Sequence, residues 1–234
     1  MIYRKTFKTK RNIKKMTKLI LISGGTASGK TTIAENLIKQ LNFYKKTATL
    51  ISTDDYYHEI SDYPNKKINQ VNWDTPKAIN GQKMIDDIKI LLSNKPISLY
   101  SYDFETATYD KNHKKTINPV DFIILEGIFA LYFDKLRELS SLKIFVDADS
   151  DIRLIRRIKR DAKIRHKKTL TDKSFYQNWI NFIKPMHDKY IAPSKHEADL
   201  IINNNKGNNQ SENNKENNEQ LNTILKLFNS QNLK

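Results

Sequence analysis

Near its amino end the chain has the sequence Leu19-Ile20-Leu21-Ile22-Ser23-Gly24-Gly25-Thr26-Ala27-Ser28-Gly29-Lys30-Thr31-Thr32, and this stretch decides the fold. A short apolar run comes first, a glycine-rich turn follows, and apolar residues then recur at helical spacing at Ile33, Leu37 and Leu41. The turn matches the pattern G-x-x-x-x-G-K-[ST] in full and lies between a strand and a helix, as the pattern requires. A chance match in a glycine turn is the alternative, which this context disfavours. The stretch therefore predicts a phosphate-binding loop.

Each part of this loop has a chemical reason. Glycines let successive backbone N–H groups turn inward around an anion, and the start of the following helix adds partial positive charge. Lys30 is expected to reach the β- and γ-phosphates, and the Thr31 hydroxyl is expected to bind Mg²⁺. The predicted nucleotide-binding residues are Gly24, Gly25, Thr26, Ala27, Ser28, Gly29, Lys30, Thr31 and Thr32.

Strand and helix patterns alternate along the rest of the chain. Strands are predicted at Leu19–Ser23, Thr47–Thr53, Asp121–Leu125, Leu142–Asp147 and Asp199–Ile202. Helices are predicted at Thr31–Leu41, Ile79–Leu92, Asp151–Ile164 and Ser174–Tyr190. Such alternation implies parallel pairing with right-handed crossovers. The expected fold is a doubly wound, mostly parallel α/β sheet of P-loop NTPase type, with a small β-hairpin arm from Ile97–Tyr102 and Lys115–Asn118.

Length and composition set the outer limits. A chain of 234 residues suits one well-cored domain, expected over residues 18–234. The hairpin arm would occupy about residues 97–118, a helical lid about 160–173, and an Asn-rich loop 203–220. Residues 1–17 are basic and are expected to form a disordered extension. A short amphipathic helix that docks on the sheet is predicted from Leu221, Ile224, Leu225 and Phe228.

Charge and residue usage narrow the class of protein. The net charge of +15 fits nucleic-acid binding, but it also fits a lysine-rich composition combined with a need to hold phosphates. We prefer the second interpretation and do not expect a nucleic-acid partner. The absence of cysteine excludes disulfides and thiolate metal sites. No apolar run is long enough to span a bilayer, so no membrane partner is expected, and a cytoplasmic location fits.

Acidic residues follow two of the predicted strands. Glu126 ends the apolar strand Ile123–Leu125, where an acid beside the phosphate loop can bind Mg²⁺. A helix-capping role is the alternative. Asp54 follows the second strand and could accept the proton of an attacking hydroxyl, or bind the metal with Glu126. An Asx-turn is the alternative for Asp54, and the residue types alone do not separate it from Asp55.

Several blocks, in order, resemble the uridine kinase family over about residues 18–203. They are Gly24–Thr32, Thr53–Tyr57, Asn72–Pro76, Ile124–Ile128, Phe145–Asp149, Arg153–Asp161, Ile183–Pro185, Pro193–Lys195 and Ala198–Ile202. The glycine loop alone is shared by many proteins, but the ordered set is specific. The resemblance implies phosphorylation of the 5′-hydroxyl of uridine or cytidine to UMP or CMP in pyrimidine salvage. It also implies Mg²⁺ as cofactor, ATP or GTP as donor, and a homo-oligomer, a tetramer in the family.

The resemblance also implies roles for single residues. Asp54 matches the family's catalytic base, Asp74 the acid that holds the ribose hydroxyls, and Glu126 the magnesium-associated acid. Catalytic roles are implied for Lys30, Arg157 and Arg160, and donor binding for Arg165. The remaining nucleoside contacts implied are Tyr57, Trp73, Tyr102, Phe104, Arg157, Lys167 and Asn178. For Arg153, Arg156 and Lys159, on the same basic helix, we expect a solvated surface.

The chain departs from the family in three places. Ala107 and Tyr109 stand where the acceptor loop of the family has His and Arg, and Arg165-His166-Lys167 replaces Arg-Gly-Arg in the lid. Both departures concern the choice of acceptor base. The third is the stretch 203–207, which replaces a Pro-x-Gly turn near the donor base.

Two other functions compete with nucleoside phosphorylation. One is a related P-loop kinase with another acceptor, such as phosphoribulokinase or pantothenate kinase. The Tyr-rich acceptor loop and the block Asn72–Pro76 favour a nucleoside instead. The other is a nucleic-acid-binding ATPase, for which the sequence contains no recognisable nucleic-acid module.

Overall fold

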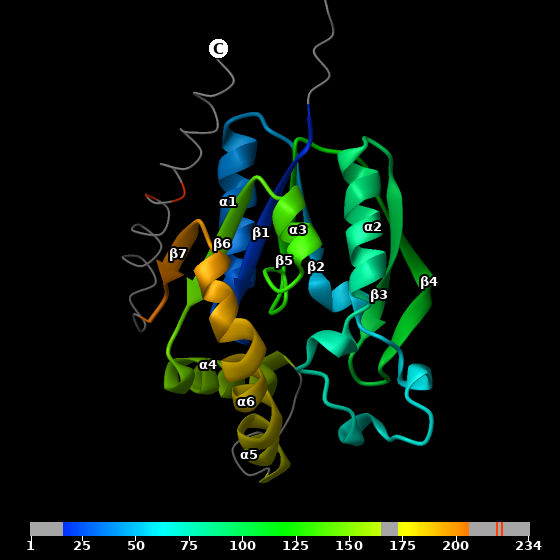
Figure 1. The fold of residues 1–234 in the computed structure, drawn as a ribbon, viewed down its shortest axis with the longest axis vertical. Coiled ribbons are helices and arrows are strands. Elements are labelled where there is room, and N and C mark those ends of the chain that lie inside the picture. The colour runs from blue at the N-terminus through cyan, green and yellow to red at the C-terminus, as the bar shows by residue number, and fades with distance from the viewer. Residues whose placement is uncertain (1–15, 165–172, 206–218, 220, 222–234) are drawn as a thin grey trace, which may run out of the picture.

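A parallel five-stranded sheet forms the centre of the molecule (Figure 1). The computed structural model describes residues 16–164, 173–205, 219 and 221. Within these residues the strand order is β2-β5-β1-β6-β7, and every neighbouring pair is parallel. The predicted fold class is confirmed. The strands are β1 (Lys18–Gly24), β2 (Ala48–Ser52), β5 (Phe122–Glu126), β6 (Leu142–Asp147) and β7 (Leu200–Asn203).

Both faces of the sheet are covered, which is why its strands are apolar without interruption. Leu19 and Leu21 of β1 point to one face, and Ile20 and Ile22 point to the other; all four are fully buried. Helix α1 (Lys30–Phe43) packs on the second face. Helices α2 (Gly81–Leu92) and α3 (Asp134–Leu139) pack on the first.

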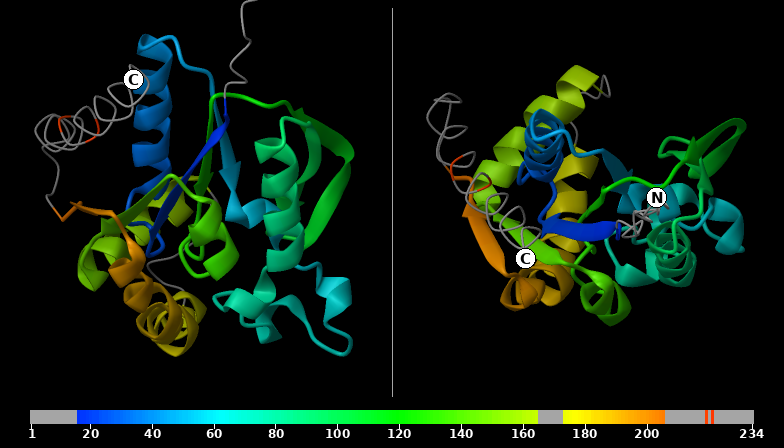
Figure 2. Two further views of the ribbon diagram at one scale, coloured as in Figure 1. Left: turned by 45° about the horizontal axis from the view of Figure 1, so that its top comes forward. Right: turned by 90° about the horizontal axis from the view of Figure 1, so that it is seen from above.

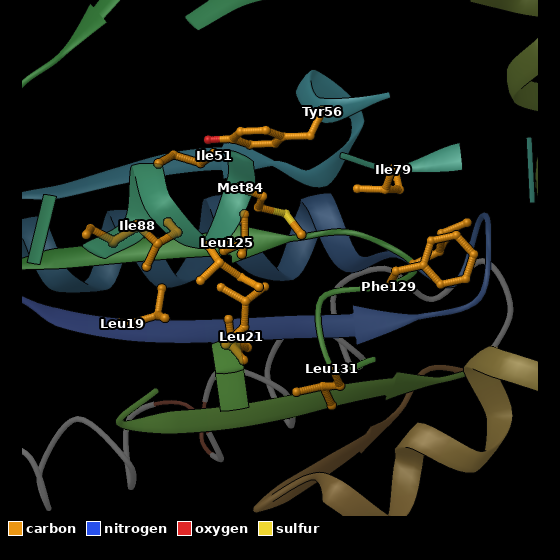
Figure 3. Close-up of a cluster of buried hydrophobic side chains, with 14 of the residues drawn as sticks. Leu19, Leu21, Ile51, Tyr56, Ile79, Met84, Ile88, Leu125, Phe129 and Leu131 are labelled. Atoms are coloured by element: carbon orange, nitrogen blue, oxygen red, sulfur yellow. The ribbon is translucent and has the colours of Figure 1, made fainter. Parts of the chain in front are cut away.

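The larger core lies between the sheet and α2. Figure 3 shows Leu21 and Leu125 of the sheet close to Met84 of α2, with Phe129 at one end of the cluster. All four of these side chains are fully buried. This core holds in place the connections that leave the carboxyl ends of β2 and β5.

Two further parts extend from the sheet. Strands β3 (Ile97–Asp103) and β4 (Thr108–Ile117) form an antiparallel hairpin, which lies beside α2 in both views of Figure 2. Helix α4 (Ser150–Ile164) crosses near the carboxyl ends of the strands (Figure 1). A second long helical stretch comprises α5 (Lys173–Asn178), a π-helical turn (Trp179–Ile183), α6 (Lys184–Met186) and another π-helical turn (His187–Ile191).

The predicted elements and the structure differ in detail. The second hairpin strand begins at Thr108 rather than Lys115. The sequence did not show this, because most residues of β4 before Ile117 are polar and exposed and carry no apolar alternation. Helix α3 was not expected; it has six residues, of which only Leu136 is buried. The helix predicted at Ser174–Tyr190 is present, but it contains the two π-helical turns.

Some predictions concern residues outside the described ranges. These are the basic extension up to residue 15, the lid segment 165–172, and most of the Asn-rich loop and terminal helix. Leu221 is described, is fully buried and belongs to the core between the sheet and α1, as the predicted docking requires. Among the described residues no helix is both long enough and apolar enough to cross a membrane.

Gly127, directly after Glu126, packs against Thr53, the residue before Asp54. A Cβ placed on Gly127 would overlap the Thr53 side chain, lying 2.6 Å from its Cβ. Real Cβ atoms essentially never come this close to a heavy atom, so the backbone on one side would have to move. Glycine at this position therefore lets the loops after β2 and β5 touch.

Gly127→Ala is expected to lower the free energy of unfolding by about 1–3 kcal/mol, the usual cost of overpacking. Urea unfolding of the purified protein would measure it. Thr53→Ala removes the nearest side-chain atoms, so the double variant should recover part of the loss. Purely additive effects of the two substitutions would show that the overlap is relieved elsewhere.

Candidate functional site

The phosphate loop joins β1 to α1 and depends on glycine at two points. Gly29 has φ of 100°, and a Cβ there would overlap the Asn204 side chain. Gly24 has φ of 147°, and its Cβ would overlap the carbonyl oxygen of Val146 on β6. Asn204 also donates from Nδ2 to the Ser28 carbonyl at 2.7 Å. The loop is thus held by the strand ends beside it.

Lys30 lies inside this loop and is only 8% exposed. Its Nζ donates to the Gly25 carbonyl at 3.0 Å. Burial lowers the pKa of Lys30, whereas the nearby Glu126 and Asp54 raise it. The lysine charge and two carboxylates therefore interact electrostatically at the carboxyl end of the sheet.

Glu126 is the last residue of β5, and hydroxyl groups from both sides donate to it. Thr31 Oγ1 lies 3.4 Å and Ser52 Oγ 3.3 Å from Glu126 Oε1. Burial raises the pKa of Glu126, and Lys30 opposes that shift. No helix begins directly after Glu126, so the helix-capping alternative is not supported. Carboxylate and hydroxyl oxygens are a donor set that fits Mg²⁺.

Asp54 and Asp55 differ in their surroundings, which the residue types alone did not show. Both lie in a 3₁₀ turn, Thr53–Tyr56, where Ser52 Oγ accepts from the Asp54 backbone N–H at 3.1 Å. The Asp54 charge acts on the pKa of Lys30 and of Glu126, so it lies within electrostatic reach of the phosphate loop. Asp55 instead lines a cavity of about 410 Å³ beside α2 and the hairpin. Burial, followed by the Asp54 charge, raises its pKa.

The four predicted aromatic residues form one cluster around Tyr57. Its ring centroid lies 5.5 Å from that of Tyr102, 5.7 Å from Phe104 and 6.1 Å from Trp73. They come from the 3₁₀ turn, the hairpin and the loop before α2, segments far apart in sequence. Phe104 is 45% exposed, so the cluster has an open side.

Asp74 lies between this cluster and the basic helix. Burial raises the pKa of Asp74, Arg157 lowers it, and Asp54 raises it again. Burial also raises the pKa of Tyr57, and the charges of Asp54, Asp74 and Arg157 all act on it. Two carboxylates, one guanidinium and one aromatic ring are therefore close enough to influence one another electrostatically.

Helix α4 brings its arginines onto the phosphate loop. Arg157 Nη1 donates to Thr26 Oγ1 at 3.0 Å, and its Nε lies 3.5 Å from Asp161 Oδ2. Arg160 Nη2 lies 2.8 Å from Asp161 Oδ1. Asp161 is 2% exposed and holds both guanidinium groups in place. The sequence suggested no such role for this acid.

One expectation for α4 was wrong. Arg153 was expected on a solvated surface, but it is 2% exposed. Arg156 is half-buried, whereas Lys159 is exposed as expected. The reason is that α4 packs against both the phosphate loop and the π-helical turn that contains Trp179. The side of α4 that carries Arg153 is therefore buried, although it is basic. The spacing of the arginines along α4 does not show which of them other parts of the chain bury.

The acceptor loop departs from the family at positions that the structure defines. Ala107 is 2% exposed with φ of 51°, and its carbonyl accepts from the Ile60 N–H at 2.8 Å. Tyr109 joins the aromatic cluster, 5.4 Å from Tyr102, and its hydroxyl donates to the Tyr57 carbonyl at 2.8 Å. His113 of the same hairpin has a side chain that is 80% exposed, and it pairs with Asp110.

Three predicted site residues are not part of this arrangement as described. Asn178 has an exposed side chain on α5, and the structure shows no contact between it and the residues around Tyr57. Arg165 and Lys167 lie outside the described residues. The sequence analysis in turn missed Ser52, which ends β2, and Asn204, which follows β7. Their position at a strand end was the only feature that could have identified them.

Comparison with known proteins agrees with this geometry. The model of the "Phosphoribulokinase / Uridine kinase family" matches residues 19–211. The chain belongs to this family. A "Uridine kinase" from Staphylococcus epidermidis is 37% identical over 188 residues, which cover 80% of this chain and 87% of that protein. "Uridine kinase-like protein 5" of Arabidopsis thaliana is 37% identical over 184 residues, 79% of this chain but 38% of the longer relative.

Solved structures support the fold. The "Possible Uridine Kinase" from Bacillus stearothermophilus superposes with a TM-score of 0.55 at 20% identity, over 80% of this chain and 88% of that one. D-glycerate 3-kinase from Cryptococcus neoformans gives a TM-score of 0.57 at 14% identity, over 80% and 86%. At such low identity these matches show the P-loop kinase fold alone.

Proposed function

We propose that the protein transfers the γ-phosphate of ATP to the 5′-hydroxyl of uridine or cytidine, giving UMP or CMP for pyrimidine salvage. The observation that carries the proposal is the meeting of Asp54, Asp74, Arg157 and Tyr57 beside the phosphate loop. This place can hold a flat base, a diol and a triphosphate at once. The uridine kinases among the relatives support the same substrate class.

The residues divide the work by position. The aromatic cluster around Tyr57 offers ring faces to the base, and the buried Asp74 carboxylate can accept both ribose hydroxyls. The 5′-oxygen then attacks the γ-phosphorus while Asp54 takes its proton, and the bond from the γ-phosphorus to the bridging oxygen breaks to release ADP. Lys30, Arg157 and Arg160 supply positive charge around the phosphoryl group.

Mg²⁺ is part of the proposal because its donor set is present. Thr31, Glu126 and Asp54 supply hydroxyl and carboxylate oxygens around one pocket. A bound Mg²⁺ would neutralise charge on the β- and γ-phosphates.

GTP is the alternative donor. A cytoplasmic location and a homo-oligomer also belong to the proposal.

A sugar-phosphate acceptor, as in phosphoribulokinase, is the other candidate in the same family. It would have no use for a cluster of four aromatic side chains, in which three surround Tyr57. A nucleic-acid-binding ATPase is not favoured, because Asp74 and the cluster form a partly enclosed place rather than an open basic surface.

A nucleoside panel tests the proposal. With ATP and Mg²⁺, uridine and cytidine should give UMP and CMP by mass spectrometry, whereas ribulose 5-phosphate and pantothenate should give no product. Lys30→Ala should nearly abolish turnover, because it removes the charge aimed at the phosphates, and its circular dichroism spectrum should match the wild type. Wild-type protein that ignores both pyrimidine nucleosides would overturn the assignment.

Asp54→Asn is expected to lower kcat by roughly 10²–10⁴, the usual size of a general-base contribution. KM should change less, since the loss lies mostly in the transition state. Asp55→Asn is the matched control, and its side chain lines the cavity on the other side of the turn. Steady-state kinetics of both variants with uridine measure the effect. A larger loss of kcat in Asp55→Asn would show that Asp55, and not Asp54, acts as the base.

Asp74→Ala is expected to raise KM for uridine and to reduce discrimination against 2′-deoxyuridine. A site built to bond a hydroxyl rejects the analogue that lacks it, because its own polar group is left unpaired. The measurement is kcat/KM for both nucleosides in wild type and variant. Selectivity that is the same in both proteins would place the ribose contact elsewhere.

A further inference from the structure

Arg153 is a buried guanidinium whose hydrogen bonds are incomplete. It is 2% exposed, and its Nε donates to the Ala148 carbonyl at 3.0 Å. Its Cζ lies 5.7 Å from the centre of the Trp179 ring, a cation–π contact. Its Nη1 is buried and has no hydrogen-bond partner. Asp147, an acid at the end of β6, pairs with Lys195 instead.

The free side of this guanidinium lies against the phosphate loop. A Cβ placed on Gly25 would lie 2.6 Å from Arg153 Nη1 and 2.9 Å from its Cζ, so only glycine leaves room for the arginine here. One helical turn further on, Arg157 donates to Thr26, the next residue of the loop. Helix α4 thus sets two arginines against two successive loop residues.

The Arg153 charge also acts inside the site. It contributes to lowering the pKa of Lys30, although burial is the larger cause. Burial together with Arg153 lowers the pKa of His187 to about 4, so this neighbouring imidazole stays neutral near pH 7. Both cations also approach the same loop residue, since Lys30 donates to the Gly25 carbonyl and Arg153 lies where a Gly25 Cβ would be.

We propose that Arg153 is a positioning residue of the donor site, a buried charge behind the phosphate loop that increases affinity for the polyphosphate of the donor. A buried cation without a full set of partners destabilises the folded protein. Negative charge bound in the loop offsets that cost, because attraction across a water-poor loop is strong. The proposal rests on the proposed function only in that the donor is a nucleoside polyphosphate.

Two opposite effects distinguish this role from simple packing. Arg153→Met keeps an unbranched side chain that reaches about as far as Nε, and it removes the charge and the unpaired donor. Its melting temperature without nucleotide should equal or exceed that of the wild type. Its affinity for ADP, measured by calorimetry at fixed Mg²⁺, should fall about ten-fold or more, the size of a charge-assisted interaction. The affinity for adenosine, which has no phosphate, should stay the same, and that for AMP should fall less than that for ADP.

Lys159→Met is the matched control, because it removes one positive charge from the exposed side of the same helix. It should leave ADP affinity within about two-fold, since exposed charges are screened by solvent and salt. An equal loss in both variants would mean that net charge alone matters, and the proposal would fail.

The remaining outcomes are also decisive. An Arg153→Met protein that melts earlier and binds ADP as tightly as the wild type would make Arg153 a packing residue only. If that variant does not fold, Arg153→Lys decides, since it keeps the charge without the planar fork. It should retain most of the ADP affinity, and a loss as large for adenosine as for ADP would overturn the proposal. Wild-type protein that binds ADP but phosphorylates no pyrimidine nucleoside would refute the proposed function and leave this inference standing.

Discussion

Parallel pairing of β5 with both of its neighbours is the constraint on which the site depends. The register sets Glu126 opposite Ile22 on β1 and opposite Ser52 on β2. Strands β2 and β5 therefore end at the same level and β1 two residues further on, so the connections that leave them share one edge of the sheet. The phosphate loop, the 3₁₀ turn with Asp54 and the glycine after Glu126 all begin there. Apolar strands buried on both faces keep this register, because a slip would expose the core.

Charge is concentrated at this edge at a real cost in stability. Lys30 and Arg153 are almost fully buried cations, and Glu126 is an almost fully buried acid. Burial shifts the pKa of each group toward its neutral form, and opposite charges restrain the shift. Buried ions that pair imperfectly contribute little to stability. This arrangement is consistent with the proposed function, in which the charge of a bound triphosphate would complement the cations and a bound Mg²⁺ would complement the acid.

The sequence predicted those features that local patterns determine. Spacing or a family block identified the glycine loop, the strands predicted from Leu19 and Asp121, and the aromatic residues near Tyr57. The side of a helix that is buried depends on distant partners, so Arg153 was misplaced. The choice between Asp54 and Asp55 depends on the direction of one turn. The polar strand β4 lacks an apolar rhythm, so its start was found several residues too late.

Ala107 and Tyr109, which differ from the family, are both held by hydrogen bonds to the backbone of other segments. Ala107 lies at a tight turn with positive φ, where its carbonyl binds the Ile60 N–H. Two residues later, the Tyr109 hydroxyl donates to the Tyr57 carbonyl, so its proton is already committed to the backbone. Tyr109 therefore orients Tyr57, and its ring adds to the aromatic surface without offering a free donor to a base. If the protein binds a pyrimidine nucleoside as proposed, the base would be recognised by ring contacts and shape more than by a side-chain hydrogen bond, and Asp74 would supply the polar contact to the ribose.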